Sequence, residues 1–179
     1  MLLLSFENTK PRIHPSVFIA KGAVVSGDVE IGEDSSIWYN TVIRGDIAPT
    51  VIGRRVSVQD NSTLHQSPNN PLILEDEVTV GHNAVLHSCV VRRGALIGMG
   101  AIVLDRAEIG EDAMVAAGAL VPPGMKVPPR TLVVGNPAKV KRELTEADYK
   151  ELVRIRQSYV DKGKMYRQLE MTPLEREEV

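Results

Sequence analysis

The 179-residue chain is long enough for one domain with a short appendage, and its 21 basic and 23 acidic residues leave a net charge of -2. This near balance gives no electrostatic reason to expect binding to nucleic acid or to an anionic membrane. Aromatic residues make up only 4% of the chain, so the core must consist of many small layers rather than a few large rings.

The beginning of the chain and its single cysteine bear on location. Residues 1–4 are apolar but are followed at once by polar residues, so the stretch is too short for a signal sequence or a membrane span. We expect it to form a first strand or a cap. Cys89 is the one cysteine, which excludes an intrachain disulfide and favours a reducing compartment. We therefore expect a cytoplasmic protein.

Aliphatic residues recur at six-residue intervals along most of the chain. A small side chain usually follows four positions later, and glycine directly follows five of the aliphatic residues. This periodicity predicts a triangular coil in which each hexapeptide supplies one short strand and one corner, with glycine tolerating the tight turn. The 18 aliphatic positions are Ile13, Ile19, Val25, Ile31, Ile37, Ile43, Ile52, Val58, Leu64, Leu74, Val80, Leu86, Val91, Ile97, Val103, Ile109, Val115 and Val121.

Three hexapeptides close one turn, so 18 positions predict six turns, spaced about 4.8 Å apart like hydrogen-bonded strands. We interpret residues 1–140 as one all-β solenoid domain, a parallel β-helix. An ordinary β-sandwich of short strands is the alternative, but sandwich strands do not keep a fixed six-residue period for over a hundred residues. The period alone leaves the handedness of the coil open.

Two insertions interrupt the six-residue period. Three extra residues fall in the stretch 47–50, and four fall in 67–71. Proline and asparagine mark both stretches as loops that bulge from a corner. Loops on a rigid solenoid commonly build binding or catalytic sites.

The six-residue pattern fails after Val121, where two proline-rich stretches lead out of the coil and residues 135–137 form a turn. From Thr145 the spacing of apolar residues becomes helical. Thr145 is the expected N-cap, with Asp148 at the capping-box position. We expect residues 141–171 to form an α-helix that packs on the coil and residues 172–179 to form a flexible tail.

The repeat predicts where the histidines lie. Arg44, His65 and His87 are the second residues of three hexapeptides that stack on one side of the prism, so His65 and His87 should be neighbours on consecutive rungs. His82 falls around a corner, one rung from Asp60, and should meet the other two histidines only in a neighbouring copy. Three-fold packing of triangular prisms closes such an arrangement. The sequence therefore predicts a homotrimer with three equivalent metal sites at its interfaces.

Three histidines suit a divalent metal ion. Three neutral imidazoles with one open position are the ligand set of a catalytic Zn²⁺ site, and Fe²⁺ or Co²⁺ accepts the same ligands. Water bound to such an ion has a pKa of about 7 and supplies hydroxide at neutral pH. The alternative for any single histidine is a surface residue bonded to a neighbour, and His14, in the first turn without a partner, is interpreted that way.

Charged and polar residues near the predicted metal site have two interpretations. Arg44, Asp46 and Asp60 are either solvated corner residues or parts of a subunit interface, and we favour a salt bridge from Arg44 to Asp60 of a neighbouring subunit. Gln59 is placed to hydrogen-bond the metal-bound water or the substrate. Cys89 lies two residues after His87 and is interpreted as a small core residue rather than a fourth ligand.

Several short segments carry a more specific signal than the repeat. Together they resemble the gamma-class carbonic anhydrases and their close relatives, over residues 10–170. These segments are Arg44-Gly45-Asp46, Gln59-Asp60-Asn61, Leu64-His65, Val80-Gly81-His82-Asn83, Leu86-His87, Ile97-Gly98-Met99-Gly100-Ala101 and Gly135-Asn136-Pro137-Ala138-Lys139.

The resemblance implies a left-handed coil and zinc or iron bound by His65 and His87 of one subunit and His82 of the next. It implies reversible hydration of CO2 to bicarbonate, with Gln59 orienting the attacking hydroxide, Arg44 and Asp60 tying subunits together, and Tyr159 approaching the pocket. The chain departs from the archetype at two places: the short loop 66–71 has no acidic residue, and Ile47 replaces a glutamate.

Two other functions remain open at this stage. The hexapeptide repeat is shared with acyltransferases that use an acyl thioester, although this chain lacks their long insertion and has three histidines where one general base suffices. The other alternative is a metal-binding homologue without efficient catalysis, since the acidic residues that could export a proton are missing.

Overall fold

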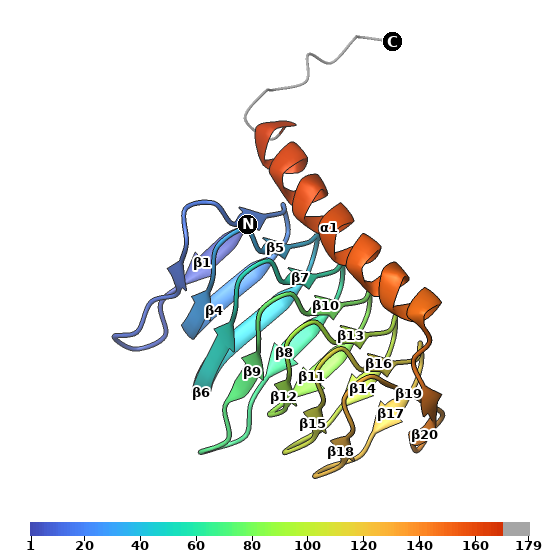
Figure 1. Cartoon of the computed structure of the whole chain (residues 1–179). Coiled ribbons are helices and arrows are strands. Elements are labelled where there is room, and N and C mark those ends of the chain that lie inside the picture. Colours follow the sequence, from blue (N-terminus) through green and yellow to red (C-terminus); the bar gives the residue numbers. More distant parts are fainter. Residues whose placement is uncertain (170–179) are drawn as a thin grey trace, which may run out of the picture.

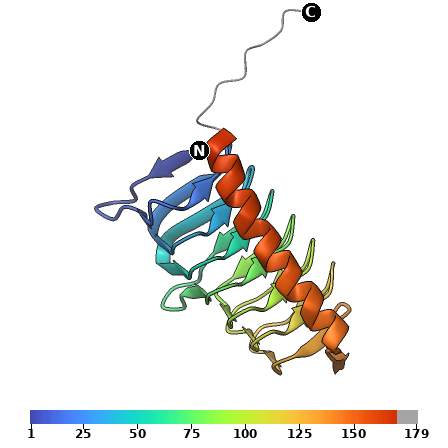
Figure 2. The ribbon, with the colours of Figure 1, turned by 45° about the horizontal axis from the view of Figure 1, so that its top comes forward.

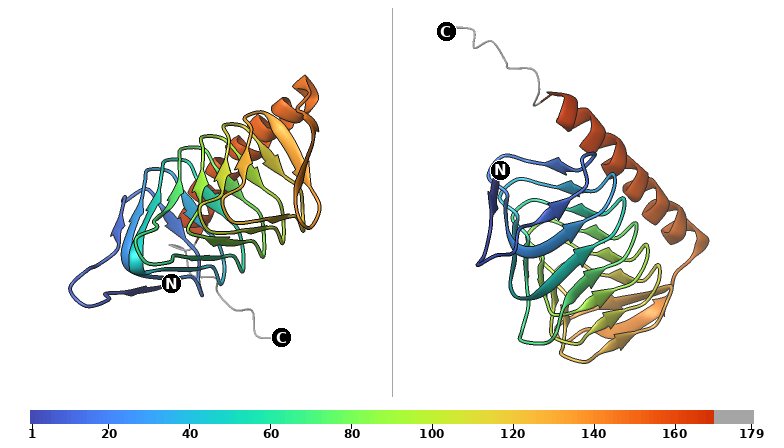
Figure 3. Two further views of the ribbon diagram at one scale, coloured as in Figure 1. Left: turned by 90° about the horizontal axis from the view of Figure 1, so that it is seen from below. Right: turned by 90° about the vertical axis from the view of Figure 1, so that its left-hand side faces the viewer.

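The structure, a computed structural model, describes residues 1–169. Its body is a left-handed parallel β-helix of about seven turns, and one α-helix runs along the outside of the coil (Figure 1, Figure 2). Two further views show the rungs stacked along one axis (Figure 3). The fold predicted from the repeat is confirmed, and the predicted tail at residues 172–179 lies outside the described residues.

The strands form a 12-stranded sheet, which bends around a corner through β4 and β6, and an 8-stranded sheet. The 12-stranded sheet contains β1 (Leu2–Leu4), β2 (Arg12–Ile13), β4 (Val24–Ile31), β6 (Val42–Ile52), β8 (Thr63–His65), β9 (Leu72–Leu74), β11 (Val85–His87), β12 (Val90–Val91), β14 (Ile102–Val103), β15 (Glu108–Ile109), β17 (Leu120–Val121) and β18 (Lys126–Val127). The 8-stranded sheet contains β3 (Phe18–Ile19), β5 (Ser36–Ile37), β7 (Ser57–Val58), β10 (Thr79–Val80), β13 (Leu96–Ile97), β16 (Met114–Val115), β19 (Thr131–Val134) and β20 (Lys139–Glu143).

The register of the rungs agrees with the sequence analysis. Leu64 pairs with Leu86 between β8 and β11, and Val58 pairs with Val80 between β7 and β10. Residues 2–4 form the first strand, β1, which pairs in parallel with β4. The expectation of a strand at the start of the chain is confirmed.

The coil is longer than the predicted six turns. Val127 and Val133 continue the six-residue spacing beyond Val121, and all three are buried in the core. The prolines after Val121 lie at corners of the coil rather than ending it. The last strand, β20, turns back and pairs antiparallel with β19, which ends the solenoid.

The two insertions behave differently. Residues 47–50 do not form the expected loop, because β6 continues from Val42 to Ile52 and the register shift is taken up opposite residues 27–29 of β4. Residues 67–71 do form a loop, closed by a bridge between Ser67 and Asn70. Proline is tolerated at a bulged strand position, so the Pro49 signal was compatible with a strand.

Glycines that follow the core aliphatic residues have a different role from the one expected. A Cβ atom on Gly81 would lie 2.7 Å from the backbone nitrogen of Met99, and one on Gly98 would lie 2.4 Å from that of Ala117. These glycines therefore permit close approach of consecutive rungs. The left-handed turn conformation is taken instead by corner residues such as Asn83, with φ of 58°, and asparagine tolerates that conformation better than most residues.

Helix α1 (Glu146–Leu169) begins with the expected cap. The Thr145 hydroxyl accepts a hydrogen bond from the Asp148 backbone nitrogen, and the Asp148 carboxylate accepts one from the Thr145 nitrogen at 2.7 Å. Gly163 then lets α1 approach β5, since an added Cβ would lie 3.2 Å from that of Ser36. Within residues 1–169 no helix is both long and apolar enough to span a membrane.

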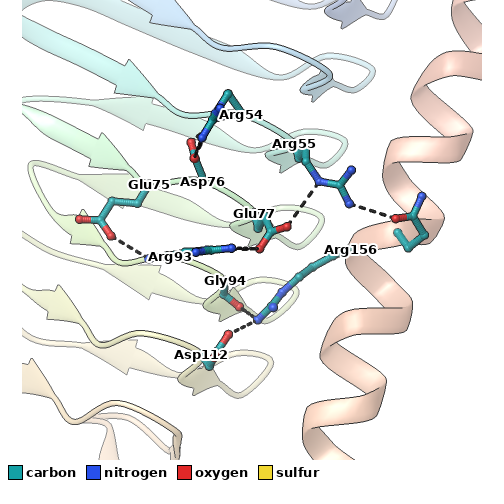
Figure 4. A network of polar contacts seen from close by, with 10 residues as sticks. Arg54, Arg55, Glu75, Asp76, Glu77, Arg93, Gly94, Asp112 and Arg156 are labelled. Carbon is teal, nitrogen blue, oxygen red and sulfur yellow. Dashed lines mark hydrogen bonds and ion pairs between the residues drawn. The ribbon is translucent and has the colours of Figure 1, made fainter.

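A corner between the two sheets fixes one edge of α1 (Figure 4). Turns at residues 54–55, 76–77, 93–94 and 111–112 stack there, and we call this the arginine corner. The buried guanidinium of Arg156 on α1 bonds to the Asp112 carboxylate and to the carbonyl of Gly94. Arg55 donates to the Gln157 side chain at 3.0 Å. The helix is therefore held in one position along the coil.

Candidate metal centre

His65 and His87 lie side by side at the ends of β8 and β11, where the strand register pairs them directly. The Nδ1 atom of His65 is 3.2 Å from the Nε2 atom of His87. Both side chains are partly buried. The predicted alignment of these two histidines on consecutive rungs is present in the structure.

Each of these imidazoles is bound by a carboxylate on its other nitrogen. His65 Nε2 is 3.1 Å from Asp46, and His87 Nδ1 is 2.9 Å from Asp105. Partial burial raises the pKa of Asp46, but hydrogen bonds from Arg44 and His65 outweigh it and leave that pKa below its usual value. Hydrogen bonds from Ser67 and then His87 lower the pKa of Asp105. Both carboxylates are therefore ionised at neutral pH.

The protonation that follows from these contacts suits a cation. An ionised carboxylate only accepts hydrogen bonds, so His65 Nε2 and His87 Nδ1 carry the ring protons. In two neutral rings, the nitrogens that face each other would both present lone pairs, and a metal ion beside them can accept both. Two nitrogen ligands of one tetrahedral Zn²⁺ ion stand about 3.3 Å apart, close to the spacing found here. A carboxylate on the far nitrogen is the usual support of a metal-binding histidine.

His82 lies around a corner from this pair. It shares a turn with Asn83, one rung after Asp60 and Asn61, and we call these four residues the histidine corner. The Nδ1 atom of His82 is 2.7 Å from the Asp60 carboxylate, so the same carboxylate–imidazole arrangement recurs with Nε2 left over. Within residues 1–169 no group of three or more histidine, cysteine or acidic side chains is arranged to hold a metal ion. One chain thus supplies two nitrogens at one place and a third elsewhere.

Two further predicted site residues line a groove with His82. Gln59 and Tyr159 border a space of about 460 Å³ between α1 and the 8-stranded sheet. Burial raises the pKa of Tyr159, and the charge of Asp60 raises it further. Its phenol therefore stays protonated at neutral pH and acts as a hydrogen-bond donor.

The two charged residues expected at the interface have partners within the chain. Arg44 forms an ion pair with Asp46, on the same strand β6. Asp60 is the partner of His82. The salt bridge between Arg44 and Asp60 of a neighbouring subunit remains a prediction.

Asp105 is the site residue that the sequence analysis missed. It is the third residue of the hexapeptide beginning at Val103, which stacks on the hexapeptide of Leu86. The register pairs Leu86 with Val103 and so sets Leu104, rather than Asp105, opposite His87; Asp105 reaches the ring from one position further along. Such a diagonal contact does not follow from the repeat, and an aspartate in a turn usually needs no explanation beyond the turn itself.

The remaining histidine and the cysteine agree with their simpler interpretations. His14 Nδ1 contacts the Ser16 hydroxyl at 2.9 Å. Cys89 is fully buried in the core, and burial raises the pKa of its thiol to about 12. Thiolates are the metal-binding form of cysteine, so Cys89 is unsuited to bind a metal at neutral pH.

Known proteins resemble this chain along most of its length. The model of the bacterial transferase hexapeptide family (six repeats) matches residues 10–45. A carbonic anhydrase of Geobacillus kaustophilus is 65% identical over 94% of this chain and 93% of its own. The mitochondrial gamma carbonic anhydrase 2 of Arabidopsis thaliana is 37% identical over 87% of this chain, which spans 57% of that protein.

A solved structure points to the same fold under another name. A Bacillus cereus protein, provisionally named as an acetyltransferase, superposes with a TM-score of 0.93, at 58% identity over 94% of this chain and 98% of its own. Fold and site together define a hexapeptide-repeat β-helix protein with a carboxylate-supported histidine pair. Within that class, the chain belongs to the gamma-carbonic-anhydrase-like family.

Proposed function

We propose that the protein catalyses the reversible hydration of CO2 to bicarbonate with a divalent metal ion, at the three interfaces of a homotrimer. The ion is Zn²⁺, with Fe²⁺ or Co²⁺ as the alternative, and its ligands are His65 and His87 of one subunit and His82 of the next. The observation that carries the proposal is the facing nitrogen pair of His65 and His87, 3.2 Å apart, with a carboxylate behind each ring.

Different residues of this chain have different roles at such a site. When bound, a divalent ion lowers the pKa of a water ligand to about 7 and so makes hydroxide available at neutral pH. Asp46, Asp105 and Asp60 each hold one imidazole in a fixed orientation and tautomer. Gln59 and Tyr159, in the groove beside His82, offer an amide and a phenol that orient the oxygen atoms of CO2 and bicarbonate.

The placement of the ligands supports a trimer. His82 has its side chain 37% exposed and more open to solvent than His65 or His87. An interface in which the His82 side of one prism meets the His65 side of the next is head-to-tail, and such an interface forms a ring when its rotation closes; for triangular prisms we propose a ring of three. Arg44 is then free to exchange its partner Asp46 for Asp60 of the neighbouring subunit.

Two supporting inferences concern location and proton transfer. The unpaired, buried thiol of Cys89 supports a reducing, cytoplasmic compartment. The loop 66–71 has no acidic residue, and its Ser67 hydroxyl instead binds Asp105. We infer that protons leave this site through solvent or buffer, so turnover should rise with buffer concentration.

The proposal is tested by measuring metal content, subunit mass and CO2 hydration on the same preparation. We expect one metal ion per subunit, a trimer in sedimentation equilibrium, and hydration above the buffer rate in stopped flow. His65→Ala should lose the metal and at least 100-fold in rate, while His14→Ala, the matched histidine outside the site, should change neither. A metal-loaded trimer with no hydration would reduce the protein to a metal-binding homologue.

The name of the Bacillus cereus relative favours acyl transfer as a second candidate. The groove beside His82 would then admit an acyl thioester, with one histidine as general base. Turnover of acetyl-CoA by metal-free protein, unaffected by His65→Ala, would support this candidate and contradict the first.

A further inference from the structure

The groove beside His82 has an apolar floor. Outward-facing side chains of three consecutive rungs form it, namely Thr79, Leu96 and Met114, which are paired in register on β10, β13 and β16. One wall is the edge of α1 that carries Ser158 and Lys162, opposite the edge held by the arginine corner. The floor spans two rung intervals, or about 10 Å.

The groove opens because the sequence beneath α1 changes. Serines 36 and 57 occupy the equivalent outward positions on β5 and β7, and Gly163 packs directly on the first of them. Leucine and methionine replace serine further along the same column, where the helix no longer has a glycine facing the sheet. The helix and the sheet therefore enclose a space that begins at His82 and extends away from it.

Charge distinguishes this groove from the other large hollows of the described chain. No carboxylate lines it, whereas Arg154 and Lys162 do. Arg154 is paired with Glu151, but Lys162 has no ion pair among residues 1–169 and lies 4.9 Å from the ring centroid of Tyr159. In a second hollow, of about 620 Å³, the lining residues Glu75, Arg92 and Glu108 pair with one another.

We propose that this groove binds an organic monocarboxylate with an unbranched apolar chain of about eight carbons. Lys162, with the Tyr159 and Ser158 hydroxyls, receives the carboxylate, and the chain lies over Leu96 and Met114. The groove, at about 460 Å³, is in the range of pockets for small organic ligands, far larger than CO2 requires. The inference shares the His82 wall with the proposed function and adds a class of ligand to that site.

The test is calorimetric titration of the metal-loaded protein with butanoate, hexanoate, octanoate and decanoate. Each added methylene should tighten binding about threefold to fourfold, up to the eight-carbon acid, with no further gain for decanoate. Lys162→Gln should weaken every acid at least threefold. Lys164→Gln is the matched control, because Lys164 is on the opposite side and pairs with Asp34, and it should leave every affinity unchanged.

Three further outcomes separate this proposal from the metal chemistry. Leu96→Ser should flatten the chain-length dependence, while Val51→Ser, at an exposed apolar residue on β6, should not; thermal unfolding verifies that both variants fold. His82→Ala should lose the metal yet still bind octanoate. Binding that vanishes with the metal but ignores Lys162 and Leu96 would overturn the groove proposal and leave the metal site standing, and affinity independent of chain length would also overturn it.

Discussion

The arginine corner and the histidine corner are built from the same repeat but use their charges in opposite ways. At the arginine corner, charged groups find partners one rung away, such as Arg54 with Asp76 at 2.8 Å and Arg93 with Glu77 at 3.3 Å (Figure 4). At the histidine corner, the acid meets an imidazole instead, Asp60 with His82. The arginine corner pairs its charges within the chain, and the histidine corner leaves an imidazole nitrogen without a partner among the described residues.

This difference shows how a solenoid separates structure from chemistry. The charge of a guanidinium bound to carboxylates is neutralised, so the arginine corner can only fix elements such as α1 in place. An imidazole has two distinct nitrogens, and pairing one of them with a carboxylate orients the other outward. The same stacking of consecutive rungs therefore attaches α1 at the arginine corner and provides candidate metal-ligand nitrogens at and beside the histidine corner.

The largest expected effect is at the ion pair between Arg156 of α1 and Asp112 of the arginine corner. Arg156→Met keeps the side-chain volume but leaves the Asp112 carboxylate, 16% exposed, without its guanidinium. Removing one partner of a buried pair costs about 3 kcal/mol or more. Urea unfolding at fixed protein concentration should show that loss, while Arg54→Met, at a 65% exposed guanidinium, should cost less than about 1 kcal/mol. Equal losses would mean that α1 is not held by Arg156.

A smaller effect is expected behind the histidine pair. Asp105→Asn keeps the shape of the side chain but weakens the acceptor of the His87 ring proton. Loss of such a support lowers metal affinity about 10- to 100-fold, measurable by competition with a chromophoric chelator. Asp76→Asn, the matched aspartate at the arginine corner, should leave metal affinity unaltered. If both variants bind metal like the wild type, the carboxylate does not support the ligand.

Backbone strain gives a third contrast, at the histidine corner. Asn83 adopts φ of 58°, a conformation that costs an ordinary residue about 1 kcal/mol. Asn83→Ala should therefore lower the free energy of unfolding by about 1 kcal/mol or less, and Asn83→Gly should not lower it. The two variants are compared by thermal unfolding. A destabilised Asn83→Gly would show that the asparagine side chain, rather than its backbone, is what the corner needs.

Much of the molecule was predictable because a six-residue period fixes registry in three dimensions. Once Leu64 and Leu86 were known to stack, the adjacency of His65 and His87 followed without any knowledge of contacts. The predicted end of the coil was wrong because Pro122 and Pro123 obscured the period: Val127 and Val133 keep the six-residue spacing, and both are buried in the core.

What the sequence could not provide was the partner of each polar group. Within one chain Arg44 pairs with Asp46 on its own strand, a partner that the sequence analysis did not name, and its bridge to Asp60 of a neighbouring subunit remains a prediction. Gly81 and Gly98 were taken as turn residues, although the space between rungs is what excludes a Cβ there. Side-chain reach decides the first case and the distance between rungs the second, and a one-dimensional pattern contains neither.

The smallest expected effect is the pH dependence of the ion pair between Asp34 and Lys164, which lies near the C-terminal end of α1. A hydrogen bond from Lys164 is the main cause that lowers the pKa of Asp34 below its usual value. A carboxyl whose pKa is lower in the folded than in the unfolded state stabilises the fold above the unfolded value, near 3.9. That contribution is lost as the pH falls through the lower, folded value. The gap in unfolding free energy between wild type and Asp34→Asn should therefore be constant from pH 7 to pH 5 and shrink below pH 4.

Because the side chain of Lys164 is 55% exposed, added salt should also reduce this gap in unfolding free energy, whereas the loss caused by Arg156→Met should be insensitive to salt. A gap that persisted at pH 2 would locate the role of Asp34 in its turn, where its φ is 56°, and not in its bond to the helix.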